Sequence, residues 1–247
     1  MPPVLRAFAD GTIFADAYGS NPPRVLALHG WRRDRSDFRE VLNGLDALAV
    51  DLPGFGASPA PPSAWGSAEY ARALEPVVAE MAAPVVVIGH SFGGRIAVHL
   101  APAWPDRVAG VVLAGVPLLR VTAPPPPALS FRIAKTLNRI GLLSDEKMEQ
   151  RRRQAGSTDY RASTGVMRDV FVGLVHETYE EQLKQIAAPV ELVWGDDDTA
   201  APLLVAQRAA ELLAHPSITI LPGAGHLTPL TAPDELRSAI VRLLPDT

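Results

Sequence analysis

The stretch Val85-Val86-Val87-Ile88-Gly89-His90-Ser91-Phe92-Gly93-Gly94 decides the fold of this 247-residue chain. Its first four residues are apolar and β-branched, which predicts a buried strand, and the residues that follow it suit a helix. Ser91 lies between the two in a G-x-S-x-G pattern, which is typical of a nucleophile on a tight turn. Because the N-terminal end of a helix favours negative charge, it would stabilise an anion formed at Ser91. We therefore predict that Ser91 is a nucleophile; the alternative is an ordinary glycine-rich turn.

Buried strands and helices alternate on both sides of this stretch, which predicts an α/β fold with a mostly parallel sheet and helices on both faces. The expected helices include Ser67–Met81 and Gly94–Ala101, and Phe8–Tyr18 reads as a hairpin around Asp10-Gly11. The expected strands are Arg24–His29, Ala47–Val50, Pro84–Ile88, Val108–Ala114, Pro189–Trp194 and Ser217–Leu221.

Residues 118–183 interrupt the alternation, because no buried strand occurs among them. The proline run Pro124–Pro127 is followed by helical, arginine-rich segments at Ala128–Ile140 and Asp145–Arg153. We predict a small helical cap over residues 118–183, inserted into a core of residues 1–117 and 184–247. The alternative is a pair of extra surface helices.

A serine hydroxyl needs a base to remove its proton, and His226 is the strongest of six histidines. It follows the last expected strand in Gly223-Ala224-Gly225-His226, at the edge of a parallel sheet where catalytic residues gather. His29 and His90 lie beside glycines in tight turns, and we expect structural or pocket-lining roles for them. The other histidines, which need no catalytic explanation, are His99, His176 and His215.

A carboxylate should hold the base in one tautomer, and Trp194-Gly195-Asp196-Asp197-Asp198 offers three after a strand. The previous strand ends in Ala114-Gly115-Val116-Pro117 and supplies none. Two N–H groups should bind the oxyanion of the reaction. They are predicted to be the backbone N–H of Phe92 and that of Trp31, in the loop after Arg24–His29.

These motifs resemble those of the α/β-hydrolase superfamily, in the same order and over nearly the whole chain. His29-Gly30-Trp31 is similar to the family's HG turn, and Asp51–Ser58 to its D-x-x-G-x-G-x-S loop. The family's G-x-x-D pattern implies Asp198 as the acid, which gives the order Ser91, Asp198, His226. Haloalkane dehalogenases and epoxide hydrolases would carry Asp in place of Ser91. The resemblance implies a mechanism that needs no metal or organic cofactor.

The expected function is a serine hydrolase that cleaves small to medium carboxylic esters through an acyl-enzyme on Ser91. An enol-lactonase, a carbon–carbon bond hydrolase or a cofactor-free haloperoxidase of the same fold would share these motifs. A non-catalytic ligand-binding protein on this fold is the alternative of another class. Turnover that depends on Ser91 would distinguish an enzyme from a binder.

The substrate pocket is expected to be lined by Trp31, Phe131, Met167 and Phe171, with Phe92, Met148 and Val172 as further candidates. Arg32-Arg33 and Arg151–Arg153 could attract an acidic substrate. The nearby Asp145, Glu146 and Glu149 favour a solvated helix face for the second run instead.

Composition excludes several other classes. The chain has no cysteine, a net charge of −4 and 47% hydrophobic residues, with no basic block. We therefore expect no nucleic-acid partner, no thiolate metal site and no disulfide. The N-terminus does not resemble a signal peptide, and no apolar run is long enough for a membrane span. The expectation is a cytoplasmic monomer or homodimer that acts on a small, ester-like substrate without contacting a membrane.

Overall fold

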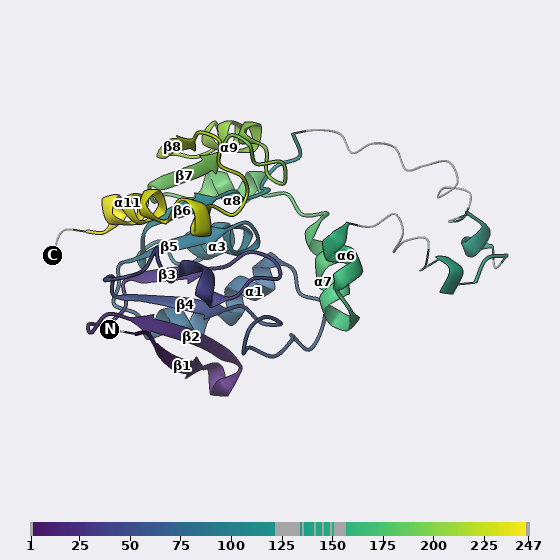
Figure 1. Ribbon diagram of the computed structural model, residues 1–247, viewed down its shortest axis with the longest axis horizontal. Helices are drawn as coiled ribbons and strands as arrows, with labels where there is room; N and C mark the ends of the chain where they lie inside the picture. The colour runs from purple at the N-terminus through teal and green to yellow at the C-terminus, as the bar shows by residue number, and fades with distance from the viewer. Residues whose placement is uncertain are drawn as a thin grey trace.

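The computed structural model describes residues 2–121, 134, 136–140, 142–144, 146–148, 150 and 157–245. Within these residues the chain forms one eight-stranded sheet in the order β1-β2-β4-β3-β5-β6-β7-β8 (Figure 1). The β1–β2 and β2–β4 pairs are antiparallel, and all other pairs are parallel. The strands are β1 (Val4–Phe8), β2 (Ile13–Tyr18), β3 (Val25–Leu28), β4 (Ala47–Asp51), β5 (Val85–His90), β6 (Val108–Ala114), β7 (Val190–Gly195) and β8 (Pro216–Leu221).

The sequence-based strand predictions are confirmed for the six parallel strands, because each observed end lies within two residues of the expected one. The N-terminal hairpin is also present, with a short 3-10 turn, η1 (Ala9–Gly11), between its strands. Asp10 in this turn has a positive φ of 54°, a conformation that Asp tolerates better than most residues. The first strand begins at Val4, four residues before the expected start, so the hairpin is longer than predicted.

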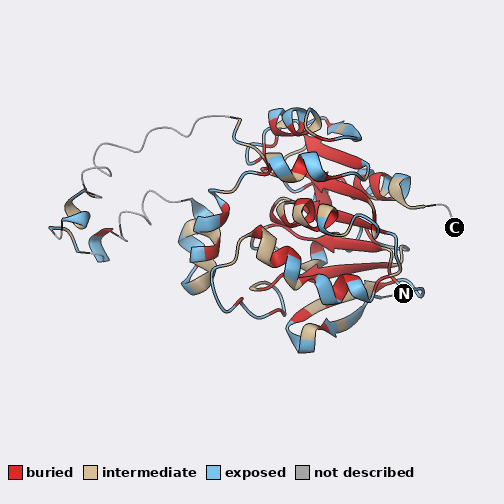
Figure 2. Cartoon of the chain, turned by 180° about the vertical axis from the view of Figure 1, so that it is seen from behind, coloured by how far each residue is buried: buried red, intermediate tan, exposed pale blue. Residues whose placement is uncertain are grey.

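Helices cover both faces of the sheet, and side chains of the strands alternate between two buried layers. In β3, Leu26 and Leu28 pack against the layer that contains α1, α2, α3, α8 and α9. Val25 and Ala27 pack on the opposite side with η2 and α11. Figure 2 shows the central strands as the buried core of the molecule and exposed outer faces on the surrounding helices. These helices are α1 (Ser67–Ala73), α2 (Glu75–Ala79), α3 (Phe92–Ala103), α8 (Glu180–Gln185), α9 (Leu203–Ala210), η2 (Arg35–Phe38) and α11 (Pro233–Leu243).

The helix expected over Ser67–Met81 is divided into α1 and α2 at Leu74, so the prediction of one continuous helix was wrong. Pro76 explains the break. It has no N–H to donate to the preceding turn, and its ring fits only the first turn of a new helix.

The described part of residues 118–183 contains helices α6 (Thr158–Ala162), α7 (Gly165–Leu174) and α8. Helices α6 and α7 lie at one end of the sheet, opposite the end where both chain termini lie (Figure 1). The segments expected to be helical at Ala128–Ile140 and Asp145–Arg153 fall largely outside the described residues. Helix α8 crosses the expected boundary between residues 183 and 184. It packs on α3 with Leu183 buried in the core.

Candidate active site

Ser91 occupies a sharp turn between β5 and α3. Its backbone has φ 49° and ψ −109°, an unfavourable conformation for a residue with a side chain. The turn is held by the Ser91 N–H, which donates to the Ala114 carbonyl at 2.9 Å, and by the Gly93 N–H, which donates to the His29 carbonyl at 3.0 Å. Neighbouring strands therefore hold the strained turn and present the Ser91 side chain at the carboxyl edge of the sheet.

The glycines at positions 89 and 93 are required by close backbone approaches. A Cβ on Gly93 would clash with the carbonyl oxygen of Leu28 in β3. A Cβ on Gly89 would lie 2.5 Å from the Cα of Gly94. Real side chains do not come this close to other atoms. Glycine is therefore required at positions 89 and 93 for α3 to begin so near to β3 and β5, which explains the G-x-S-x-G pattern.

Ser91, His226 and Asp198 are joined by hydrogen bonds although they come from three loops far apart in the sequence. His226 Nε2 lies 3.0 Å from Ser91 Oγ, and His226 Nδ1 lies 2.8 Å from Asp198 Oδ2. Asp198 Oδ1 accepts hydrogen bonds from the N–H groups of Ala200 and Ala201 at 2.9 and 2.8 Å. When His226 Nδ1 carries the proton and donates a hydrogen bond to Asp198, Nε2 is unprotonated and its lone pair points at the serine hydroxyl. This arrangement allows Nε2 to accept the proton of Ser91.

The three aspartates after β7 have different surroundings. The side chains of Asp196 and Asp197 are exposed, and Asp196 accepts a hydrogen bond from the Gly223 N–H at 2.7 Å. Asp198 is buried, at 3% exposure. Gly115, after β6, makes room for it, since a Cβ there would lie 2.9 Å from Asp198 Oδ2. The structure therefore places Asp198, and neither neighbour, against His226.

His90 and His29 have structural contacts beside this group, as expected. His90 Nε2 lies 2.8 Å from the carbonyl oxygen of His226, and burial, together with the nearby His226, lowers the pKa of His90 to about 4. His29 Nδ1 contacts the Gly30 carbonyl at 2.7 Å, and its Nε2 accepts from the Leu52 N–H at 3.0 Å. Burial lowers the pKa of His29 as well. Both rings are thus neutral near pH 7, and His90 donates to the backbone of His226.

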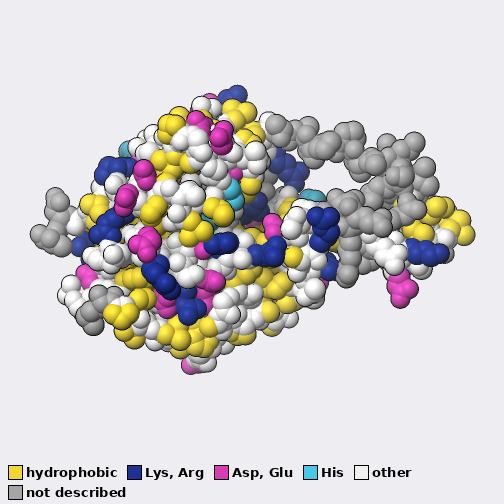
Figure 3. Space-filling view, viewed as in Figure 1, with side chains coloured by type: hydrophobic (Ala, Val, Ile, Leu, Met, Phe, Trp, Pro, Cys, Tyr) yellow, Lys and Arg dark blue, Asp and Glu magenta, His cyan; other side chains and the backbone are white. Residues whose placement is uncertain are grey.

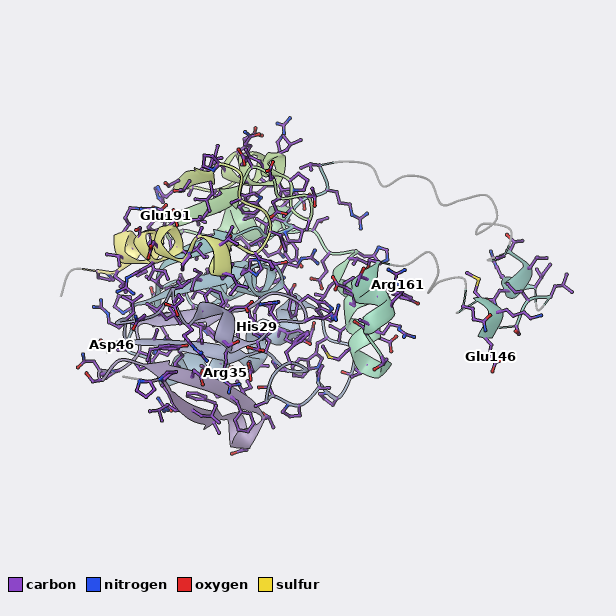
Figure 4. The ribbon with its side chains drawn as sticks, in the orientation of Figure 1. His29, Arg35, Asp46, Glu146, Arg161 and Glu191 are labelled. Carbon is purple, nitrogen blue, oxygen red and sulfur yellow. The ribbon has the colours of Figure 1, made fainter. Side chains whose placement is uncertain are left out.

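The loop Asp51–Ser58 is organised around the buried carboxylate of Asp51. This carboxylate accepts from the backbone N–H groups of Arg35 and Ala57, at 2.9 and 2.7 Å, and forms an ion pair with the Arg35 guanidinium. Ser58 Oγ donates to the Asp51 carbonyl at 2.7 Å. Arg35, labelled in Figure 4, lies in η2, which packs against β3 and β4. Asp51 therefore stabilises the loop next to the site without belonging to it.

Phe92 and Trp31 meet beside Ser91, with ring centroids 5.3 Å apart. Within the described part of the chain, the backbone N–H of Phe92 and that of Trp31 donate to no acceptor. Two unused N–H groups next to a serine are available to a ligand oxygen. Phe55 and Phe171 extend the aromatic cluster around Trp31.

A cavity of about 290 Å³ opens over Ser91 and His226. Its wall is formed by loops that follow β3, β5, β6, β7 and β8 and by helix α7, which contributes Phe171 and Leu174. Because most of these residues follow the carboxyl ends of parallel strands, the cavity lies where this class of sheet binds ligands. The lining residues are Gly30, Trp31, Arg33, His90, Ser91, Phe92, Arg95, Pro117, Asp159, Phe171, Leu174, Val175, Ala200, His226 and Leu227.

Of the expected pocket residues, Trp31, Phe92 and Phe171 line this cavity. Met167 does not, because its sulfur packs over Gly54 instead. Phe131 lies outside the described residues, Met148 is buried outside the lining, and Val172 is exposed.

Sequence reasoning missed Arg95 and Leu227. Arg95 lies in α3 four residues after Ser91, so its closeness to the serine in the sequence was the available signal. Nothing in the sequence signals Leu227 except its position next to His226.

The other histidines lie outside the cavity lining. His99 packs edge-on against Tyr179, while His176 and His215 are exposed. Among the described residues, no group of three His, Cys, Asp or Glu side chains is arranged to hold a metal ion. No helix in that part of the chain combines the length and apolar character needed to cross a bilayer.

The mostly parallel sheet, with a serine on the turn after β5 and a histidine and an aspartate after β8 and β7, defines an α/β-hydrolase fold. Residues 25–239 match the model of the alpha/beta hydrolase family. The chain therefore belongs to this family.

Several known proteins are similar to the chain. The magnesium-chelatase 30 kDa subunit of Rhodobacter capsulatus is 31% identical over 262 residues, covering 92% of this chain and 88% of that protein. An esterase of Mycobacterium tuberculosis is 39% identical over 125 residues, which cover 47% of this chain and 40% of the esterase. The solved esterase of Exiguobacterium antarcticum has a TM-score of 0.73 at 22% identity, covering 97% and 98% of the two chains, and shows likeness of fold alone.

Proposed function

We propose that this protein hydrolyses carboxylic esters of small to medium size through an acyl-enzyme on Ser91. The observation that carries the proposal is the hydrogen-bonded series Ser91 Oγ, His226 and Asp198, with separations of 3.0 and 2.8 Å, at the wall of a cavity. A cavity of about 290 Å³ is near the lower end of ligand-binding pockets, which favours a small substrate. The similarity to an esterase over 125 residues supports the same substrate class.

In the first half of the proposed reaction, Ser91 Oγ attacks the ester carbonyl carbon and gives its proton to His226 Nε2. The negative charge that develops on the carbonyl oxygen is held by the N–H groups of Phe92 and Trp31. The bond between the carbonyl carbon and the alcohol oxygen then breaks, and His226 returns the proton to the departing alcohol. The acyl group remains on Ser91.

In the second half, water attacks the acyl carbon and His226 takes one of its protons. The bond to Ser91 Oγ breaks, Ser91 recovers the proton, and the carboxylic acid leaves. Asp198 stays ionised and stabilises the positive charge on the imidazole at each step. The buried His90, whose Nε2 donates to the His226 carbonyl, holds the backbone of the base in place.

We also propose that residues 118–183 act as a cap over the cavity. Phe171, Leu174 and Val175, in and next to α7, contribute to its wall. The Leu174 carbonyl accepts a hydrogen bond of 2.6 Å from Arg95, which anchors the end of α7 to the helix that follows Ser91. The identity of residues in this segment would then determine which acyl or alcohol groups fit.

The test is hydrolysis of p-nitrophenyl esters of increasing acyl length by the wild type, Ser91→Ala and Asp198→Asn. We expect Ser91→Ala to lower activity by several orders of magnitude. Asp198→Asn should lower kcat on the order of 10⁴-fold, because the amide N–H₂ group that would then face His226 Nδ1 donates a hydrogen bond and favours the wrong tautomer of the imidazole. Ser238→Ala, at an exposed serine on α11, is the matched control and should behave like the wild type.

Labelling with a fluorophosphonate tests the nucleophile independently of substrate choice. The wild type should gain one adduct on the peptide that contains Ser91, and Ser91→Ala should gain none. Ester turnover that persists in folded Ser91→Ala would contradict the proposal. Absence of both turnover and labelling would favour the ligand-binding alternative.

A further inference from the structure

Arg95 differs from the other charged residues at the cavity wall because it forms no ion pair with a carboxylate of the described residues. Arg33 is paired with Asp37, with distances of 2.7 and 2.5 Å from the guanidinium to the carboxylate oxygens. Asp159 is paired with Arg32 at 3.3 Å. In the part of the chain that the structure describes, Arg95 has no acidic group within 4 Å.

The hydrogen-bonding capacity of Arg95 is also largely unused. One terminal nitrogen donates to the Leu174 carbonyl at 2.6 Å, and the guanidinium lies 6.0 Å from the centre of the Tyr179 ring. Its Nε is buried and has no partner among the described residues. A buried donor without an acceptor is costly, and a guanidinium presents five N–H groups. A hydrogen bond to one carbonyl, which a neutral donor could provide equally well, does not account for this side chain.

The position of Arg95 in α3 adds to the positive potential at the cavity. Helix α3 has 12 residues, and Arg95 is the fourth of them, near the N-terminal end, which is the positive end of the helix dipole. No acidic residue occurs in the first turn of this helix. A cation at this end of a helix is disfavoured unless an anion approaches. Figure 3 shows further Lys and Arg side chains where α6 and α7 meet the rest of the molecule.

We propose that Arg95 binds a carboxylate of the substrate, so that the preferred esters carry a negative charge. This inference rests on the ester hydrolysis proposed above and names its substrate class. Ser91 and Arg95 both line the cavity, and their backbone positions are four residues, or about 6 Å along a helix, apart. A carboxylate a few methylene groups from the scissile carbonyl, or one on a compact alcohol, spans such a distance. The planar guanidinium can bind it through two parallel hydrogen bonds.

Two substrate pairs that differ only in charge test the proposal. The first is the mono-p-nitrophenyl ester of adipic acid beside that of adipamic acid, with the charge on the acyl side. The second is 4-acetoxybenzoate beside 4-acetoxybenzamide, with the charge on the alcohol side. The readout is the ratio of kcat/KM for the charged member to that for the neutral one, from which a general loss of active protein cancels.

We expect a ratio well above one in the wild type for at least one pair, and a fall on the order of 10- to 100-fold in that ratio in Arg95→Met. Arg95→Lys, which keeps the charge but loses the planar fork, should retain part of the preference. Arg161→Met is the matched control: it changes the net charge equally, at an exposed side chain on α6 that does not line the cavity (Figure 4), and should keep the wild-type ratio. Equal ratios in the wild type and Arg95→Met for both pairs would overturn the proposal.

A binding measurement separates failure of this inference from failure of the proposed function. Adipate and 4-hydroxybenzoate should raise the Tm of Ser91→Ala more than adipamate, the monoamide of adipic acid, and 4-hydroxybenzamide do, and the difference should vanish in Ser91→Ala/Arg95→Met. If no ester is hydrolysed, this difference still supports an anion site at Arg95, and its absence refutes one. If esters are hydrolysed without regard to charge, only the inference about Arg95 fails.

Discussion

Replacement of His90 by Gln should make the protein less sensitive to acid. His90 is 1% exposed, and its Nε2 donates to the His226 carbonyl at 2.8 Å. Its Nδ1 is buried against Gly30, where a Cβ would lie 2.8 Å away, and has no hydrogen-bond partner among the described residues. Protonation of His90 would therefore bury an unpaired charge. Desolvation is the main reason that its pKa falls from 6.5 to about 4, and the nearby His226 adds to the effect.

The size of the effect follows from linkage between protonation and folding. Between pH 6.5 and 4 the unfolded chain binds a proton at this position that the folded chain does not, so stability falls as the pH falls. A difference of about 2.5 in pKa, at about 1.4 kcal/mol for each unit, gives a limit of about 3 kcal/mol, most of which is lost by pH 4. Above about pH 6.5 His90 is neutral in both the folded and the unfolded chain, so none of this stability is lost there. Asp37 and Asp198, which raise the pKa of His90 slightly, are already included in this value.

The assay is urea denaturation, followed by tryptophan fluorescence, of the wild type and His90→Gln at several pH values between 7.5 and 4. We expect the free energy of unfolding of the wild type to fall by about 3 kcal/mol more than that of the variant over this range. His29 is also buried with a lowered pKa, but it is present in both proteins and cancels. His215→Gln, at an exposed histidine, is the control and should follow the wild type. Parallel losses in the wild type and His90→Gln would refute the reasoning.

Two further substitutions test the supports of the site. Asp51→Ala should lower the free energy of unfolding by about 3–5 kcal/mol, because two backbone N–H groups lose their buried acceptor and Arg35 keeps only Asp16 as a carboxylate partner. Asp106→Ala, at an exposed carboxylate, should change it little, and equal effects in urea denaturation would contradict the role of Asp51. Gly93→Ala should lower the free energy of unfolding by at least about 1–3 kcal/mol and remove most of the ester hydrolysis, since its Cβ would clash with the Leu28 carbonyl. A Cβ on Gly173 in α7 would meet no atom within 4 Å, so Gly173→Ala should be neutral or stabilising by up to about 1 kcal/mol. In thermal melts, Gly93→Ala should therefore lower the Tm, whereas Gly173→Ala should leave it unchanged or raise it.

Much of the fold could be predicted because its signals are local. The six parallel strands are short apolar runs bounded by Gly, Pro or Asp, and all of them except the edge strand β8 are buried. Ser91 could be located because the strain of its turn requires glycines at fixed positions on either side. Failures at this level were also local: the effect of Pro76 on the helix after Ser67 was overlooked, and the first strand was begun too late.

The sequence by itself determined the strand and helix pattern, the position of Ser91 and the two loops that would carry a histidine and an acid. The residues alone left three aspartates open and only the family resemblance singled out Asp198, because the contact with His226 depends on space made by Gly115 in a different loop. The hydrogen bond from Arg95 to Leu174 and the contact of His90 with His226 likewise depend on segments distant in the chain. These features were decided only by tertiary structure, because the direction and burial of a side chain are set by neighbours that packing brings to it.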